Sequence, residues 1–160
     1  KRNKVEAILD YLKIDKKEYL KNNELYITSN EIKEMINDGF YIGGHTMSHP
    51  PLKLLSIDEQ EREIVHSINW VKEHFDLNYS FFAFPFSDES LSKELVKRLV
   101  SKYNKIKIFG NSGIKKDIHP SIIQRFTLED PNISAGKKIV FENLLSTYRK
   151  LRSKNKIIRQ

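Results

Sequence analysis

Two histidines four residues apart are the part of the sequence best suited to chemistry. His45 and His49 lie in the segment Gly43–Pro50, directly after two glycines. Neutral imidazoles at this spacing can turn toward one metal ion, and the glycines let the backbone bend sharply beside it. Two ligands alone do not complete a zinc site, and a pair of histidines at this spacing also occurs as ordinary surface residues. The segment is therefore a candidate metal site that needs at least one more ligand.

Alternating helical patterns and short β-prone runs would position this segment. Apolar residues at helical spacing, with capping boxes at Thr28–Glu31 and Ser56–Glu59, predict helices in the first dozen residues and over residues 28–38, 56–75, 91–99 and 134–151. Strands are predicted at residues 40–42, 80–84, 106–109 and 122–126. This alternation predicts a parallel sheet with crossover helices, either open or closed into a barrel. The histidine segment would then follow the carboxyl end of a strand, where parallel α/β folds place their sites.

The composition excludes several classes of protein. The chain has 160 residues, 39% hydrophobic and 31% charged, so it can bury a core and is neither disordered nor collagen-like. It contains no cysteine, which excludes disulfides and thiolate metal ligands. No apolar run reaches the ~20 residues of a membrane helix. Because the first residue is Lys1 and a complete β/α barrel takes about 200 residues or more, we expect this sequence to be a piece of a longer chain.

The net charge of +7 is concentrated at the end of the sequence. Residues 137–160 are strongly basic and hold one acid, Glu142, whereas the charges of residues 1–136 balance. The basic segment 149–160 could contact an anionic membrane surface or an acidic glycan. By default, however, we expect a solvated helix end with a frayed tail. No nucleic-acid-binding fold is recognisable, so we expect no nucleic-acid partner.

Two motifs follow each other in the middle of the sequence. From Gly44 to Pro50 the chain reads Gly-His-Thr-Met-Ser-His-Pro, followed by an acidic helix containing Glu63 and by the run Phe82-Ala83-Phe84-Pro85-Phe86. The histidine segment and this aromatic run together resemble the polysaccharide deacetylase family. The resemblance covers residues 25–90 well and the rest loosely. Members of this family remove N-acetyl, and sometimes O-acetyl, groups from chitin, peptidoglycan and exopolysaccharides.

The resemblance implies roles for the residues that match the family's motifs. His45 and His49 match its two histidine ligands for a divalent metal, usually Zn²⁺. Phe84, Pro85 and Phe86 match a segment that forms one wall of the substrate groove, and the backbone N–H of Phe86 matches a donor that holds the oxyanion. Such a fixed N–H stabilises the negative oxygen of a tetrahedral intermediate. Without the histidines, this aromatic run would be interpreted simply as a buried strand.

Departures from the family pattern bear on activity. The family has two adjacent aspartates, a general base and a third metal ligand, ahead of the histidine motif, and no Asp-Asp pair occurs in this sequence. We expect the third ligand to be an aspartate upstream of Lys1, and within the chain Asp88 and Asp117 are the candidates. Ala83 stands where many members have an arginine. The missing groups leave the activity of this chain alone open.

Two more residues have open roles. The family's late histidine, a general acid in many members, has no clear match, and His119 lies ahead of the last predicted strand rather than after it. His119 is therefore either that acid or a loop histidine. Arg125 lies near the end of the same strand, where it could orient a carboxylate or pair with Glu129 or Asp130.

These observations predict an α/β fold, namely a partial parallel β/α barrel of the polysaccharide deacetylase type that lacks its first strands. Residues 1–136 would form the middle and C-terminal part of that domain, and residues 137–160 a helix with a basic tail in the same domain. The parent protein is predicted to be a metal-dependent hydrolase of N-acetyl or O-acetyl groups on a bacterial-type polysaccharide, of which this chain is an incomplete or inactive piece. The alternative is a non-catalytic relative that binds carbohydrate or a partner through the same groove. The resemblance alone favours a location in the cell envelope or outside the cytoplasm.

Overall fold

The structure is a computed structural model that describes residues 2–23 and 25–160. It divides into two compact units, Lys1–Tyr41 and Ile42–Gln160. The second unit contains the sheet and every residue that the sequence marks for chemistry. Among the described helices, none has the length and apolarity that crossing a bilayer requires.

The Lys1–Tyr41 unit is built from helices that begin with side-chain caps. Thr28 accepts a hydrogen bond from the Glu31 backbone, and Glu31 reaches back to the Thr28 backbone, so the predicted capping box is confirmed. The Asp15 carboxylate caps a helix that the sequence did not predict. In their described residues these helices are α1 (Arg2–Tyr11), α2 (Lys16–Asn22) and α3 (Ser29–Asn37).

A parallel sheet lies at the centre of the second unit. Within the described residues its strands are β1 (Phe81–Ala83), β2 (Lys107–Gly110) and β3 (Ile122–Gln124), in that order. The register pairs Phe82 with Ile108, and Ile108 in turn with Ile122. The strands therefore run in one direction and their carboxyl ends share one edge. This confirms the predicted parallel sheet, whereas a closed barrel is not present in the described part of the chain.

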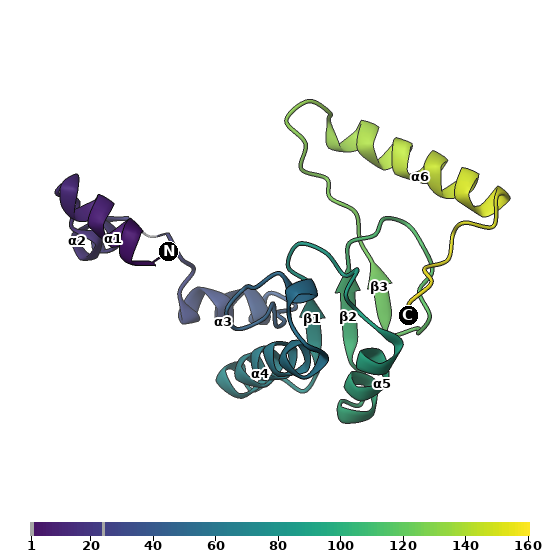
Figure 1. Ribbon diagram of the computed structural model, residues 1–160, viewed down its shortest axis with the longest axis horizontal. Helices are drawn as coiled ribbons and strands as arrows, with labels where there is room; N and C mark the ends of the chain where they lie inside the picture. The colour runs from purple at the N-terminus through teal and green to yellow at the C-terminus, as the bar shows by residue number, and fades with distance from the viewer. Residues whose placement is uncertain (1, 24) are drawn as a thin grey trace. The chain divides into compact units, whose positions relative to one another are not determined.

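Two helices cover one face of this sheet and form the core with it. They are α4 (Ile57–Phe75) and α5 (Lys93–Lys102), which contact each other beside the sheet (Figure 1). The side chains of Phe82, Ile108 and Ile122 are buried in the cluster that these helices complete. Helical spacing puts the apolar side chains on one stripe of each helix, which explains the burial. The buried residues of the stripes are Ile64, Val65, Ile68, Leu95, Val96 and Leu99.

The predicted strand at residues 40–42 is wrong, because the chain pairs with β1 two residues later. The Gly44 N–H donates to the Phe81 carbonyl at 2.8 Å, and the Ala83 N–H donates to the Gly44 carbonyl at 2.9 Å. These bonds form a parallel bridge between Gly44 and Phe82. A glycine is required here, since a Cβ on Gly44 would lie 2.6 Å from the Ser67 hydroxyl. The β-prone side chains of residues 40–42 therefore predicted the residues that pair with β1 at the wrong place in the sequence.

The C-terminal segment is folded against the unit, contrary to the expectation of a frayed tail. It follows α6 (Ala135–Leu151), whose position agrees with the prediction and which Figure 1 shows apart from α4 and α5. Lys156 forms a parallel bridge with Lys116, and the Gln160 carbonyl accepts a hydrogen bond from the Lys93 N–H at 2.9 Å. Arg159 is buried. The tail is therefore tied down at several points because its polar groups find partners in the body.

Candidate active site

The candidate site lies at the carboxyl edge of the sheet. The histidine segment leaves the sheet after Gly44, the turn Pro85–Asp88 leaves it after β1, and Asn111 directly follows β2. Parallel strands bring these three exits to the same edge. The short 3₁₀ helix η1 (Leu52–Leu54) then leads from the histidine segment toward α4.

The two histidine rings lie close together and are exposed. Their centroids are 5.0 Å apart, and the rings are inclined at 60°. The Nδ1 atom of His45 lies 2.7 Å from the Ala83 carbonyl oxygen. Because a carbonyl can only accept, Nδ1 must carry the proton, which leaves Nε2 of His45 with its lone pair available for a ligand. The His49 ring packs edge-on against Phe86, with centroids 4.8 Å apart.

Several residues at this edge have positive backbone φ angles. Thr46 has φ 67°, His49 has φ 53° and Phe86 has φ 56°. None of the three is a glycine, and such conformations cost of order 1 kcal/mol or more each, so surrounding contacts must hold them. Backbone strain of this kind is common in ligand sites. Within the histidine segment, the His49 N–H donates to the Thr46 hydroxyl at 3.1 Å.

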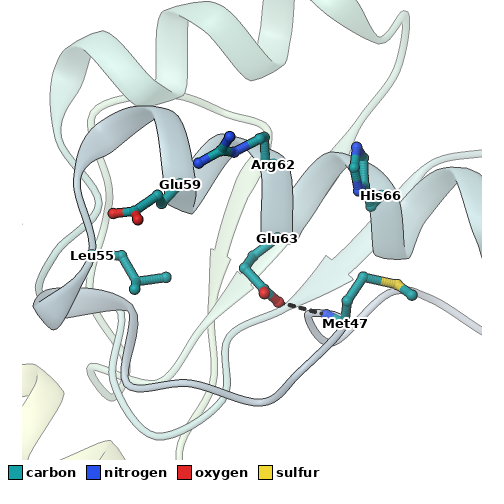
Figure 2. A pocket seen from close by; sticks show the side chains of 6 residues that line it. All are labelled: Met47, Leu55, Glu59, Arg62, Glu63 and His66. Atoms are coloured by element: carbon teal, nitrogen blue, oxygen red, sulfur yellow. Dashed lines mark hydrogen bonds between the residues drawn. The ribbon is translucent and has the colours of Figure 1, made fainter.

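The side chain of Glu63, in α4, contacts the histidine segment. It accepts hydrogen bonds from the backbone N–H groups of Met47 and Ser48 and from the Ser48 hydroxyl. Figure 2 shows the bond from the Met47 backbone. Partial burial raises the pKa of the Glu63 carboxyl, but the hydrogen bonds from Ser48 and Met47 outweigh this effect and hold the pKa below its usual value. Glu63 is therefore ionised at neutral pH.

The three aromatic-run residues differ in their exposure. The Phe86 side chain is 62% exposed, whereas Phe84 and Pro85 are buried. This differs from the expectation that all three line the groove, because Phe84 packs on the Phe82 ring inside the core. Within the described residues, no group accepts a hydrogen bond from the Phe86 N–H, while the Phe86 carbonyl accepts one from the Asn111 side chain. The Phe86 N–H thus remains available to a ligand.

A buried ion cluster supports the Phe86 turn. Asp88 and Asn111 exchange hydrogen bonds between backbone and side chain. Asp88 also binds the Arg159 guanidinium at 2.6 Å, and Arg159 in turn binds Asp117 through Nε and Nη2. Burial raises the pKa of both carboxyls, but the Arg159 hydrogen bonds and the other donors outweigh burial, so both have a pKa below the usual value. Sequence reasoning missed this cluster, because Arg159 is far from both partners along the chain.

The two residues with open roles lie in different places. His119 precedes β3 at the amino edge of the sheet, where its Nδ1 accepts a hydrogen bond from the Ser121 N–H. The structure therefore does not bring His119 together with the paired histidines. Arg125 follows β3 at the carboxyl edge, and its Nε donates to the Gly110 carbonyl. In the described chain Arg125 forms no ion pair with either expected partner, since Asp130 pairs with Lys138 instead.

The donor set fits a metal ion in part. Two imidazoles with centroids 5.0 Å apart can share one ion, and the bond from His45 to a carbonyl is typical of histidine ligands. A catalytic zinc takes three protein ligands. Among residues 2–23 and 25–160 no group of three histidine, aspartate or glutamate side chains is close enough to hold a metal. Asp88 and Asp117, the candidates within the chain, are instead engaged by Arg159.

Comparisons with known proteins identify a family and a similar solved structure. A family model described as polysaccharide deacetylase matches residues 2–104. The structure is similar to that of the Streptococcus pyogenes deacetylase PplD in complex with acetate, with a TM-score of 0.53 and 25% sequence identity. This similarity covers 71% of the present chain and 50% of the other, so the chain spans about half the length of that solved relative. The search of curated proteins gave no match.

Proposed function

Because the chain belongs to the polysaccharide deacetylase family, we propose that it carries part of the active site of a metal-dependent enzyme that hydrolyses N-acetyl groups of a polysaccharide. The observation that carries the proposal is the placement of His45 and His49 beside the Phe86 turn at the carboxyl edge of the sheet. The similar deacetylase structure holds acetate, which is the product that hydrolysis of an acetyl group releases. O-acetyl groups are a second candidate substrate of the same chemistry.

His45 and His49 would hold the ion, and the third ligand would be an aspartate outside this sequence. When bound, a divalent ion such as Zn²⁺ polarises a carbonyl and makes a nucleophile of water. The hydrogen bond to Ala83 fixes the tautomer and the direction of the His45 ring. The edge contact with Phe86 limits the rotation of the His49 ring.

Phe86 would stabilise the developing charge. Addition of water to the acetyl carbon moves negative charge onto the carbonyl oxygen, and the Phe86 N–H would donate a hydrogen bond to this oxygen. Loss of one such donor costs about 10²–10³ in kcat in well-studied hydrolases. The buried Phe84 and Pro85 would act as the support of the Phe86 turn. Arg125 lies at the same edge and is a candidate for orienting a carboxylate, whereas His119 is not part of this proposal.

A non-catalytic carbohydrate-binding relative is the second candidate function. It is favoured by Ala83, at the position of the family's arginine, and by the absence of a third metal ligand in the described residues. An exposed aromatic such as Phe86 would serve a binding protein as well as an enzyme.

Acetate release distinguishes the two candidates. The full-length protein is incubated with Zn²⁺ and several N-acetylated glycans, and free acetate is measured. We expect acetate release by the full-length protein without substitutions, no release by its His45→Ala variant, and unchanged release by its His119→Ala variant, which alters a histidine at the opposite edge of the sheet. Glycan binding without acetate release from any substrate would favour the non-catalytic relative.

A further inference from the structure

We propose that Glu63 is a positioning residue that fixes the two histidines relative to each other by holding the turn between them. The proposal rests on the proposed metal role of His45 and His49. Met47 and Ser48 lie between these histidines in the sequence, so a group that holds both residues sets how far apart and in which direction the two rings point.

Glu63 anchors the turn through three hydrogen bonds. One carboxylate oxygen accepts from the Met47 N–H at 2.8 Å and from the Ser48 N–H at 3.0 Å. The other oxygen accepts from the Ser48 hydroxyl at 2.7 Å. Hydrogen bonds to an ionised acceptor are shorter and about twice as strong as those between neutral groups. A single side chain therefore holds two consecutive residues of the turn at three points.

The anchor is itself rigid. Glu63 belongs to the middle of α4, and the next two residues, Ile64 and Val65, are buried in the core. The α4 backbone also lies directly under the start of the histidine segment, since a Cβ on Gly44 would lie 2.9 Å from the Ile68 nitrogen. The position of Glu63 is thus determined by the packing of the core rather than by the turn that it holds.

Side-chain packing would not hold the turn if the Glu63 carboxylate were removed. Met47 is exposed, and a cavity of about 350 Å³ lies between the turn and α4. Figure 2 shows the Met47 and Glu63 side chains at this cavity, joined by the hydrogen bond to the Met47 backbone. The positive φ angles of Thr46 and His49 favour a change of conformation once the turn is released. The cavity is lined by Met47, Leu55, Glu59, Arg62, Glu63 and His66.

Substitution of Glu63 separates position from charge and size. Glu63→Ala removes all three hydrogen bonds. Glu63→Gln keeps a carbonyl oxygen that can accept from the Met47 and Ser48 N–H groups, so it should hold the turn nearly as well as Glu63 does. Ser48→Ala removes the hydroxyl contact alone and changes an exposed residue, so it cannot disturb the core. Glu73→Ala, which removes an exposed carboxylate elsewhere on α4, is the matched control.

Two measurements on the full-length protein test the proposal. The first is amide hydrogen exchange of residues 46–49 without metal, which should become faster in Glu63→Ala and stay unchanged in Glu73→Ala. The second is the affinity for Zn²⁺ by calorimetry, which should fall about 10- to 100-fold in Glu63→Ala, as for other groups that orient metal ligands. Glu63→Gln should lie close to the parent protein in both.

The outcomes separate this inference from the proposed function. If His45→Ala binds Zn²⁺ as tightly as the parent protein, the proposed metal site is wrong. If binding depends on His45 but Glu63→Ala leaves it unchanged, Glu63 has no positioning role. Weaker binding in Glu63→Ala without faster exchange would also overturn the inference, since Glu63 would then act through its charge alone.

Discussion

Gly43 and Gly44 determine how closely the histidine segment approaches the sheet and α4. A Cβ on Gly43 would lie 2.8 Å from the Phe81 carbonyl oxygen, and one on Gly44 would lie 2.6 Å from the Ser67 hydroxyl. Both glycines are thus required by the space around them. The side chain of His45 begins one residue beyond this contact, so the place of the first candidate ligand depends on the absence of a side chain at Gly44.

Gly44→Ala is expected to destabilise the Ile42–Gln160 unit by about 1–3 kcal/mol, since overpacking forces backbone shifts. The chemical denaturation midpoint, followed by fluorescence of Trp70, measures the effect. Gly136→Ala is the control, because a Cβ there meets no atom within 4 Å and alanine favours a helix by up to about 1 kcal/mol. An equal effect of both substitutions would contradict the steric argument.

The described helices α3, α4, α5 and α6 begin after a serine or a threonine, but the caps differ. Ser56 forms a complete capping box with Glu59 at the start of α4. Ser134 stands at the same position of α6 and its side chain makes no capping hydrogen bond. The two serines therefore allow the contribution of a cap to be compared within one chain.

Ser56→Ala is expected to lower the free energy of unfolding by about 1 kcal/mol, because one N-terminal donor of α4 loses its partner. Ser134→Ala should leave it nearly unchanged, since no hydrogen bond is lost. Thermal unfolding followed by circular dichroism compares the two variants. A similar loss in both would mean that the effect comes from the unfolded chain rather than from the cap.

Apart from α2, elements with local signals could be predicted from the sequence, and those with non-local causes could not. The capping boxes at Thr28 and Ser56 are complete within four residues, and the apolar stripe of α4 repeats at helical spacing, so both predictions are confirmed. The pairing of Gly44 with β1 depends on space beside α4, which the sequence does not display. β-prone side chains at residues 40–42 therefore gave a strand at the wrong place.

The candidate site likewise contains residues that the sequence predicted and residues that it did not. The spacing of His45 and His49 and the run to Phe86 were visible in the sequence, and the structure brings these residues together. The groups that hold them were not visible, because Glu63 and Arg159 act from 15 and 71 residues away. Contacts at such separation follow from tertiary packing and leave no local pattern.

At the scale of the whole Ile42–Gln160 unit, Arg159 connects the C-terminal segment to the candidate site. It is buried with Asp88 and Asp117, and Asp88 holds Asn111, whose side chain donates to the Phe86 carbonyl. Removal of the guanidinium would leave two buried carboxylates without a cation. Arg159→Met is therefore expected to destabilise the unit by about 3–5 kcal/mol, and Arg159→Lys by less, as measured by urea unfolding.

The same cluster predicts how stability depends on pH. Asp88 and Asp117 have a pKa below the usual value in the folded protein, so the unfolded chain binds protons first as the pH falls. Their contribution is complete above the ordinary aspartate pKa of about 3.9 and is lost as the pH falls through the folded pKa. The free energy of unfolding should therefore decrease below about pH 5.

The slope of this decrease should be smaller in Arg159→Lys, whose amine makes fewer hydrogen bonds to the two carboxylates. Lys97→Met, which removes an exposed cation of α5, should keep the parent slope. Urea unfolding at a series of pH values between 3 and 6 provides the measurement. Equal slopes in the parent protein and in Arg159→Lys would show that other carboxylates cause the pH dependence.

The separation of Asp88 and Arg159 by 71 residues also has a consequence during synthesis. At about 5–20 residues per second, a ribosome adds the intervening chain in about 4–14 s. Throughout this interval the carboxylate of Asp88 lacks its cation, and the turn that presents the Phe86 N–H lacks part of its support. We therefore expect the histidine half of the site, whose anchor Glu63 is only 15 residues from Ser48, to form on the nascent chain well before the half that contains Phe86.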